Sequence, residues 1–352
     1  MYRLNVLNDN KRSRHRYVTY IILMLIIQSG FRNFAVGDDT YAYYLAFESV
    51  QNTTWTEIFQ NFYDVYVIGE GKDAGYDFLV KLFSSVFPSF RLFLVAIAIC
   101  FFCPLYRLIE KELSSIKDIF FSFVIYQTLF YSFFSITGLR QTIATIATIL
   151  SINYIKRKQL LRFLLLILAA SIVHKSVLIF IPFYFIANIK NSNKVLITSL
   201  VVMPLIFPYM RTLAELLVSI LGFDNYIDYL NPDDAVSGAI NFAVFMMLTA
   251  ILVLFAKKYK STSIPNYLVI ATAIAILCTP LTWINPSLMR VVQYFSIFLI
   301  IALPLAVRNL GVDKSLSNLI YIGILLLLLL TIIRRGAEYA FFWQEMMLGT
   351  NY

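Results

Sequence analysis

The residues of this chain that could do chemistry are charged side chains beside long apolar runs. Arg32 and the adjacent carboxylates Asp38 and Asp39 directly follow the first of these runs. A charge kept next to hydrocarbon is costly and is often functional, so this stretch suggests a site for a charged, hydroxyl-rich ligand. Tyr41 and Tyr44, which come next, could hold sugars against their rings. Alternatively, Asp38 or Asp39 only caps the following helix by accepting a backbone N–H.

Two more arginines open apolar runs further along the chain. Arg140 is followed by Gln141, and Arg290 is followed by Tyr294 one helical turn later. The guanidinium group suits phosphate because it can donate two parallel hydrogen bonds. The simpler alternative is that each arginine stands at a helix end and extends its charge to the membrane surface.

A histidine and an acid complete the set of candidates. His174 interrupts an apolar segment and adjoins Lys175 and Ser176. Histidine exchanges protons near neutral pH, so His174 is a candidate general base, although a histidine among apolar residues is more often a packed core residue. Glu70 stands in a glycine-containing stretch before Tyr76. Alone, Glu70 would be an ordinary loop acid.

Composition sets the fold class. Hydrophobic residues make up 60% of the 352 residues and charged residues 14%, which is more apolar material than a soluble core of this length would hide. We therefore predict an all-α, polytopic membrane protein with about eleven transmembrane helices, within a range of about 10 to 12, in a single domain. The predicted spans are 17–30, 90–107, 118–136, 138–155, two arms within 160–188, 195–211, 239–256, 265–283, 291–307 and 316–333.

The distribution of charge gives the predicted orientation. Basic residues precede the first span and cluster again at 156–158, and the positive-inside rule places them in the cytoplasm. The loops 32–89 and 212–238 and the C-terminus then lie outside. The positive-inside rule accounts for the net charge of +9, so this charge does not predict nucleic-acid binding. With two histidines, and three cysteines that lie in apolar runs, we predict no metal site and no cofactor.

Two segments have a more detailed prediction. In the loop 32–89, Thr54 and Glu57 have the spacing of a capping box, and the aromatic residues that follow predict a helix lying flat on the membrane. The run 76–88 is short and predicts an interfacial or re-entrant helix. The segment 160–188 has basic residues at both ends, so it must turn back, and the turn falls near His174.

Taken in order, these residues resemble the EpsG-type Wzy polysaccharide polymerases. The likeness extends from about residue 17 to residue 305, and the order and spacing of short matches carry it. The matches are Arg32 followed by Gly37-Asp38-Asp39-Thr40-Tyr41, Glu70 with Gly75-Tyr76, Arg140-Gln141, His174-Lys175-Ser176 with Pro182, and Arg290 with Tyr294.

The resemblance implies a metal-independent glycosyltransferase of GT-C-like architecture in the bacterial inner membrane, with its active site facing the periplasm. It would join undecaprenyl-diphosphate-linked oligosaccharides into O-antigen, capsule or exopolysaccharide, with membrane lipid and a chain-length regulator protein as further partners. The three arginines, Arg32, Arg140 and Arg290, would bind the diphosphate. His174 or Asp38 would take the proton of the acceptor hydroxyl. The substrate would also contact Asp39, Tyr41, Tyr44, Glu70, Gln141 and Tyr294.

Two rival functions remain open. The pair Asp38 and Asp39 also resembles the acidic pair of metal-dependent glycosyltransferases that use a polyprenyl-phosphate sugar, in which carboxylates hold a divalent cation. Dependence on metal would distinguish this enzyme from the polymerase. A flippase or other transporter of lipid-linked oligosaccharides would need charged residues through the bilayer midplane and often pseudo-repeats, and the sequence shows neither.

Overall fold

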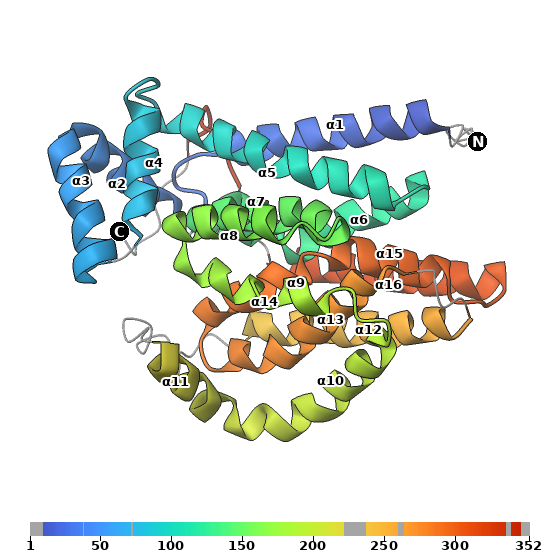
Figure 1. Cartoon of the computed structure of the whole chain (residues 1–352). Coiled ribbons are helices and arrows are strands. Elements are labelled where there is room, and N and C mark those ends of the chain that lie inside the picture. Colours follow the sequence, from blue (N-terminus) through green and yellow to red (C-terminus); the bar gives the residue numbers. More distant parts are fainter. Residues whose placement is uncertain are drawn as a thin grey trace. The chain divides into compact units, whose positions relative to one another are not determined.

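The computed structural model describes residues 10–37, 39–71, 73–221, 237–259, 264–335 and 339–345. Over these ranges the secondary structure is helical, apart from an isolated antiparallel bridge between Arg32 and Phe341 (Figure 1). The chain forms two compact units. The first comprises residues 1–119, 130–181 and 335–352, and the second comprises residues 120–129 and 182–334.

The first unit contains most of the residues that the sequence singles out. Its helices are α1 (Lys11–Gly30), α2 (Thr40–Asn52), α3 (Trp55–Tyr63), the π-helix η1 (Asp64–Ile68), α4 (Ala74–Ser84), α5 (Phe90–Glu112), the π-helix η2 (Ser132–Thr137), α7 (Leu139–Lys156), α8 (Leu160–Val173) and the 3-10 helix η3 (Lys175–Phe180). The helix α6 (Ile116–Leu129) leads from the first unit into the second.

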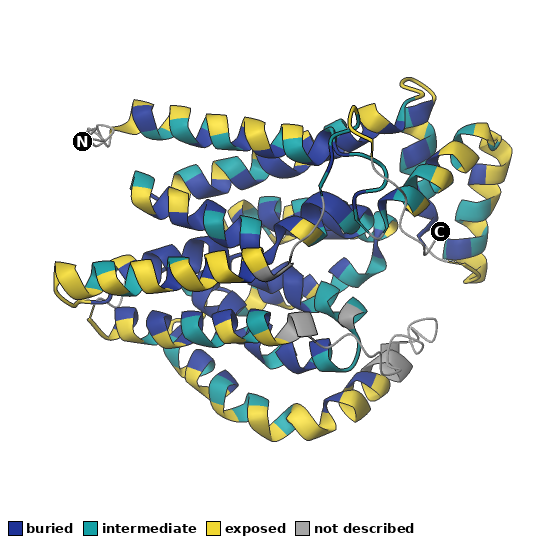
Figure 2. Ribbon diagram, turned by 180° about the vertical axis from the view of Figure 1, so that it is seen from behind, coloured by how far each residue is buried: buried dark blue, intermediate teal, exposed yellow. Residues whose placement is uncertain are grey.

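The helices of the second unit range from one turn to more than twenty residues, and the longer ones are apolar. They are α9 (Phe183–Ile186), α10 (Ser192–Ile206), α11 (Met210–Leu221), α12 (Ser237–Tyr259), α13 (Asn266–Cys278), α14 (Met289–Ser296), α15 (Leu299–Arg308) and α16 (Lys314–Arg335), with short 3-10 turns between some of them. The helix α10 carries exposed apolar side chains along its length, among them Ile197, Val201 and Leu205, and Figure 2 draws such exposed residues in yellow. Such apolar exposure suits a helix that faces lipid.

The number of helices long and apolar enough to cross a membrane is lower than the predicted eleven. Within the described ranges there are five, or six if the bent pair α14 and α15 is one span. The five are Phe90–Glu112, Ser192–Leu216, Ile240–Tyr259, Asn266–Trp283 and Lys314–Ile333. The other predicted spans form helices too, but α1 begins with four basic residues in its first six, α6 gives way to a π-helix, and α8 has only 14 residues. The structure is thus that of a polytopic helical membrane protein.

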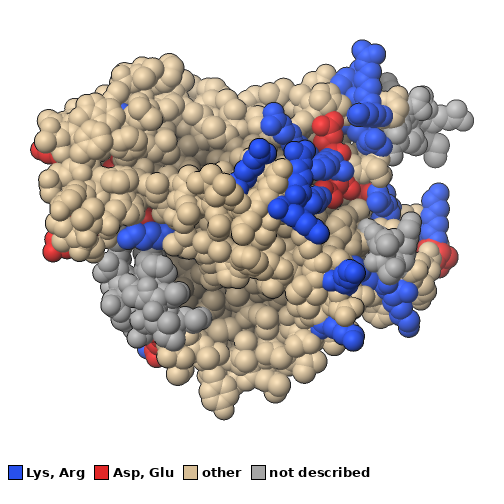
Figure 3. All heavy atoms as spheres, in the orientation of Figure 1, with Lys and Arg blue, Asp and Glu red and all other residues tan. Residues whose placement is uncertain are grey.

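One end of the first unit is rich in ionic contacts. His15 at the start of α1 lies 2.8 Å from Glu110 near the end of α5, and Lys156 at the end of α7 pairs with Glu112. Figure 3 shows Lys and Arg side chains, with acids beside them, gathered near the start of α1. The helices α1, α5 and α7 therefore share one charged end.

The opposite end of the first unit carries the loop 32–89 and the described part of the C-terminal segment. Asn33 N–H donates to the carbonyl of Ala340 over 2.9 Å, and Phe342 N–H donates to the carbonyl of Phe31 over 3.0 Å. The guanidinium of Arg91 also lies 4.3 Å from the ring centroid of Phe342. The loop and the described C-terminal residues therefore lie together.

Two local predictions are confirmed. Thr54 and Glu57 form a capping box at the start of α3, and their hydrogen bonds run in both directions. The helix α8 ends at Val173, and the ring of Phe180 returns to within 6.4 Å of the ring of Phe163. The chain therefore reverses at His174. With 14 residues, α8 is about 21 Å long, which is shorter than a bilayer core of about 30 Å.

Cysteine labelling tests which end of the first unit faces outside. We expect a membrane-impermeant maleimide added to intact cells to label Asn52→Cys and not Arg157→Cys, because the basic end should stay in the cytoplasm. Both positions are exposed, and the three native cysteines would first be replaced by serine. Labelling of both after permeabilisation is the control. The reverse pattern in intact cells would invert the topology.

Candidate active site

Three segments that are distant in sequence meet in the first unit. They are the loop before α4, the start of α7 and the end of α8. Gly69, Gly71 and Asp73 all have left-handed backbone conformations, with φ of 92°, 95° and 54°. Glycine adopts this conformation easily and aspartate tolerates it better than most residues, so the chain can wind tightly here and direct the Asp73 side chain inward.

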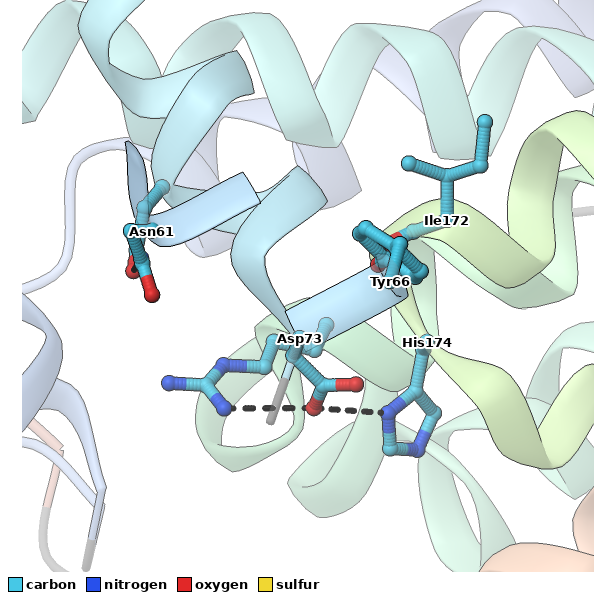
Figure 4. A network of polar contacts seen from close by, with 7 residues as sticks. Asn61, Tyr66, Asp73, Ile172 and His174 are labelled. Atoms are coloured by element: carbon cyan, nitrogen blue, oxygen red, sulfur yellow. Dashed lines mark hydrogen bonds and ion pairs between the residues drawn. The ribbon is translucent and has the colours of Figure 1, made fainter. Parts of the chain in front are cut away.

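The centre of the site is the carboxylate of Asp73. Its Oδ2 atom accepts a hydrogen bond from Arg140 Nη1 over 3.2 Å and contacts His174 Nδ1 over 3.3 Å. The dashed lines of Figure 4 mark both contacts. Asp73 is 7% exposed and His174 is 5% exposed. A carboxylate so deeply buried is stabilised by the two nitrogen groups that face it.

The close approach of α4 to α8 sets the distance between Asp73 and His174. Gly75 packs directly against the backbone of Ile172, and a Cβ atom at Gly75 would lie 2.3 Å from the Ile172 carbonyl oxygen. That carbonyl also accepts a hydrogen bond from the hydroxyl of Tyr66. Figure 4 shows Tyr66 and Ile172 beside the Asp73–His174 pair. A residue larger than glycine at position 75 would push the two helix ends apart.

We therefore expect Gly75→Ala to destabilise the protein by about 1–3 kcal/mol, because the added methyl group meets backbone that cannot yield. Thermal unfolding in detergent measures the effect. The matched control is Gly323→Ala in α16, where the added Cβ would meet nothing within 4 Å. Equal melting temperatures for the two variants would contradict the close packing of α4 on α8.

The pKa values of two carboxylates, one in α4 and one in the loop before it, shift in opposite directions. Burial alone would raise the pKa of Asp73, but the hydrogen bond and charge of His174 and the charge of Arg140 outweigh it, so the pKa is lowered from 3.8. Burial raises the pKa of Asp77, one helical turn further on, which accepts a hydrogen bond from Asn61 over 3.1 Å. Asp73 therefore keeps its negative charge to a lower pH than Asp77 does.

Several polar atoms at this site are buried without a hydrogen-bond partner in the described part of the chain. They are His174 Nε2, Asp73 Oδ1, Arg140 Nε and the hydroxyl of Tyr76. Buried polar atoms nearly always have partners, and an exception needs an explanation. Four such atoms on contacting residues indicate a place where a polar ligand completes the hydrogen bonding.

Aromatic rings enclose the guanidinium of Arg140. Its central carbon lies 4.9 Å from the ring centroid of Tyr76 and 5.9 Å from that of Tyr43. The two tyrosine rings meet edge to face at 5.7 Å, and Tyr76 belongs to a hydrophobic cluster with Phe47 and Phe93. These rings hold the arginine in place by packing and by cation–π attraction.

The structure brings two of the predicted site residues together, Arg140 and His174. Arg32 is 1% exposed, and its guanidinium donates to the carbonyls of Ser29 and Ile136 and to the hydroxyl of Thr40. These contacts tie the end of α1 to the end of η2. Arg32 is thus engaged with the protein's own backbone.

The other predicted residues of the first unit lie around the site or away from it. Asp39 stands before α2 without a side-chain capping hydrogen bond. The ring of Tyr44 stacks on Phe34 at 4.7 Å and Tyr41 lies 6.0 Å from Tyr44. Glu70 is exposed and Gln141 is buried.

Arg290 and Tyr294 lie in the second unit, both in α14. Arg290 is half-buried and Tyr294 is fully buried. Asp38 and residues 222–236 of the predicted outer loop lie outside the described residues. Over the ranges that are described, no group of three or more His, Cys, Asp or Glu side chains could hold a metal ion.

Asp73, Tyr43 and Tyr76 belong to the site although they are not among the predicted site residues. Asp73 was one acid among several in its loop, and its partners are 67 and 101 residues away along the chain. The available signal was Gly71 and Gly75 on either side of Asp73, which marks a tight turn and a close approach. Tyr43 lies between the predicted site residues Tyr41 and Tyr44, and the phase of α2 decides which tyrosine reaches Arg140.

Comparison with known proteins gives one match. The model of the EpsG family matches residues 15–347, which is nearly the whole chain. No curated protein and no solved structure matches it.

Proposed function

The chain belongs to the EpsG family, the family of Wzy-type polysaccharide polymerases, and from this premise we propose that it polymerises undecaprenyl-diphosphate-linked oligosaccharides. The product would be an O-antigen, capsule or exopolysaccharide. The observation that carries the proposal is the buried contact of Asp73 with His174, which leaves Nε2 of the imidazole without a partner. Asp73 would hold the proton on Nδ1, and Nε2 would then carry the lone pair.

The proposed reaction is a glycosyl transfer. The imidazole Nε2 of His174 takes the proton of a hydroxyl on the non-reducing end of a lipid-linked unit. The oxygen attacks the anomeric carbon of the growing chain, and the bond from that carbon to the lipid diphosphate breaks. The electron pair of this bond leaves with the diphosphate. The imidazolium is stabilised by Asp73 and gives its proton to solvent or to the departing phosphate.

Arg140 is the proposed cation for the leaving group. Its Nη1 atom is engaged with Asp73, while its Nε atom is buried without a partner. The guanidinium can therefore bind Asp73 through Nη1 and still donate a hydrogen bond from Nε to the substrate. Stabilising the charge that develops on the diphosphate is among the largest contributions a protein makes to such a reaction.

The proposal also includes the setting of the reaction. The site would face the periplasm from the bacterial inner membrane, in a GT-C-like arrangement in which α1, α7 and the two arms that meet at His174 also cross the bilayer. A chain-length regulator protein would be the partner that limits the product. The short α8 supports this setting, because a 14-residue helix that began at the cytoplasmic surface would end, with His174 next to it, short of the outer surface.

Purified protein in nanodiscs, supplied with one defined lipid-linked repeat unit, tests the proposal. We expect a ladder of elongated lipid-linked products that persists in EDTA. If EDTA abolished the ladder and Mn²⁺ or Mg²⁺ restored it, the metal-dependent glycosyltransferase with Asp38 and Asp39 as ligands would replace the polymerase mechanism. If no sugar–sugar bond formed under any condition, the proposed function would be wrong.

A further inference from the structure

The cations of the first unit differ in how far the protein itself uses them. Arg32 donates to two backbone carbonyls and a hydroxyl, and Arg140 is paired with Asp73. Lys175 adjoins His174, and its ammonium takes part in none of the hydrogen bonds or ion pairs of the described chain. The ammonium instead lies over an aromatic ring. Among the cations near His174, Lys175 is therefore the one whose ammonium is left to form an ion pair and hydrogen bonds with a ligand.

The contact of Lys175 fixes where its ammonium lies. Its Nζ atom is 5.5 Å from the ring centroid of Tyr66, within the range of a cation–π interaction. Tyr66 is itself held by the hydrogen bond from its hydroxyl to the carbonyl of Ile172, at the end of α8. The same carbonyl packs against Gly75. The ring is thus a fixed support that holds the ammonium at the α8 terminus from which His174 also projects.

The chemistry of this arrangement suits a phosphate. Asp73 neutralises much of the charge of Arg140 within the site, so Arg140 alone would give a dianionic diphosphate incomplete compensation. An ammonium is a compact charge that binds phosphate as a point cation. Lys175 is half-buried, so a ligand can reach it and water screens it less than at an open surface.

We propose that Lys175, supported by Tyr66, forms a phosphate-binding subsite next to His174 that takes the diphosphate of a polyprenyl lipid. This inference rests on the proposed function for the identity of the lipid. Lys175 would thus bind the diphosphate, the role that the sequence predicts for Arg32 and Arg290. Tyr66 is a positioning residue, because it acts through the ammonium.

Binding of undecaprenyl diphosphate to the full chain in nanodiscs, measured by native mass spectrometry, tests the subsite. Lys175→Gln should weaken binding about 10- to 100-fold, as expected when a hydrogen bond to a charged group is lost. Lys175→Arg should retain most of the affinity. The affinity for undecaprenol, which has no phosphate, should not change, and Lys190→Gln at an exposed position is the matched control. An unchanged affinity of Lys175→Gln for the diphosphate would overturn the inference.

A second measurement uses the unmodified protein and so does not depend on the folding of a variant. Undecaprenyl diphosphate should protect Lys175 from acylation several-fold more than it protects Lys190. Equal protection would contradict the subsite. The subsite and the proposed function can fail separately: polymerisation with no dependence of binding on Lys175 removes the subsite alone. Binding that depends on Lys175 without any polymerisation removes the proposed function alone.

Discussion

His174→Ala is expected to lower the rate of polymerisation by about 10²- to 10⁴-fold, the usual contribution of a general base. The reason is that Nε2 of His174 is the buried, unpartnered atom that can take the proton of the acceptor hydroxyl. The initial rate of ladder formation measures the loss. Binding of the lipid-linked unit should change little, because the base acts on the transition state.

His174→Gln is the matched variant for this test. Glutamine can still donate a hydrogen bond to Asp73 and fills most of the same volume, but its amide cannot act as a base near neutral pH. We expect His174→Gln to fold like the wild type and to be as inactive as His174→Ala. A rate near that of the wild type in either variant would make His174 a structural residue, and Asp38 would then be the preferred base.

Asp73→Asn is expected to cost a similar factor, about 10²- to 10⁴-fold, for a different reason. The amide oxygen can take the place of Oδ2 and still face Arg140 and His174. What is lost is the negative charge that stabilises the imidazolium as the proton moves. The same rate assay measures the effect, and a fully active Asp73→Asn would separate the carboxylate from the reaction.

The difference in stability between the wild type and Asp73→Asn should also depend on pH and should become smaller in acid. Because the pKa of Asp73 is lowered from 3.8 in the folded protein, its carboxylate stabilises the fold at every pH above this value. The contribution is lost as the pH falls through the lowered pKa. Wild type should therefore melt at a higher temperature than Asp73→Asn at neutral pH, and the difference should shrink below pH 3.8. A difference that grew towards acid would contradict this assignment.

Much of the local structure could be predicted because the signals lie within a few residues. The capping box of Thr54 and Glu57 and the chain reversal at His174 depend on nearby polar and basic residues, and both are confirmed. The helical fold class follows from composition. The number of spans is less predictable, because charges within helix ends and breaks such as η2 decide it.

The site itself depends on contacts that a single sequence does not reveal. Arg140 and His174 were identified because each places a polar group at the end of an apolar run. Asp73 joins them only through the left-handed turn at 69–73 and the close packing of Gly75. Arg32, like Arg140, stands at the end of an apolar run, yet its guanidinium donates hydrogen bonds to the carbonyls of Ser29 and Ile136. The sequence could not show this difference, since Ile136 is 104 residues away.

The most direct test of the central claim is the amount of undecaprenyl diphosphate released for each sugar–sugar bond formed. The wild-type protein in nanodiscs, in the presence of EDTA, would be given a repeat unit with a labelled lipid, and both products would be counted in the same reaction. The account predicts one undecaprenyl diphosphate for each new bond, and the loss of both products together in His174→Gln. New bonds without release of the diphosphate lipid, or equal yields from wild type and His174→Gln, would contradict it.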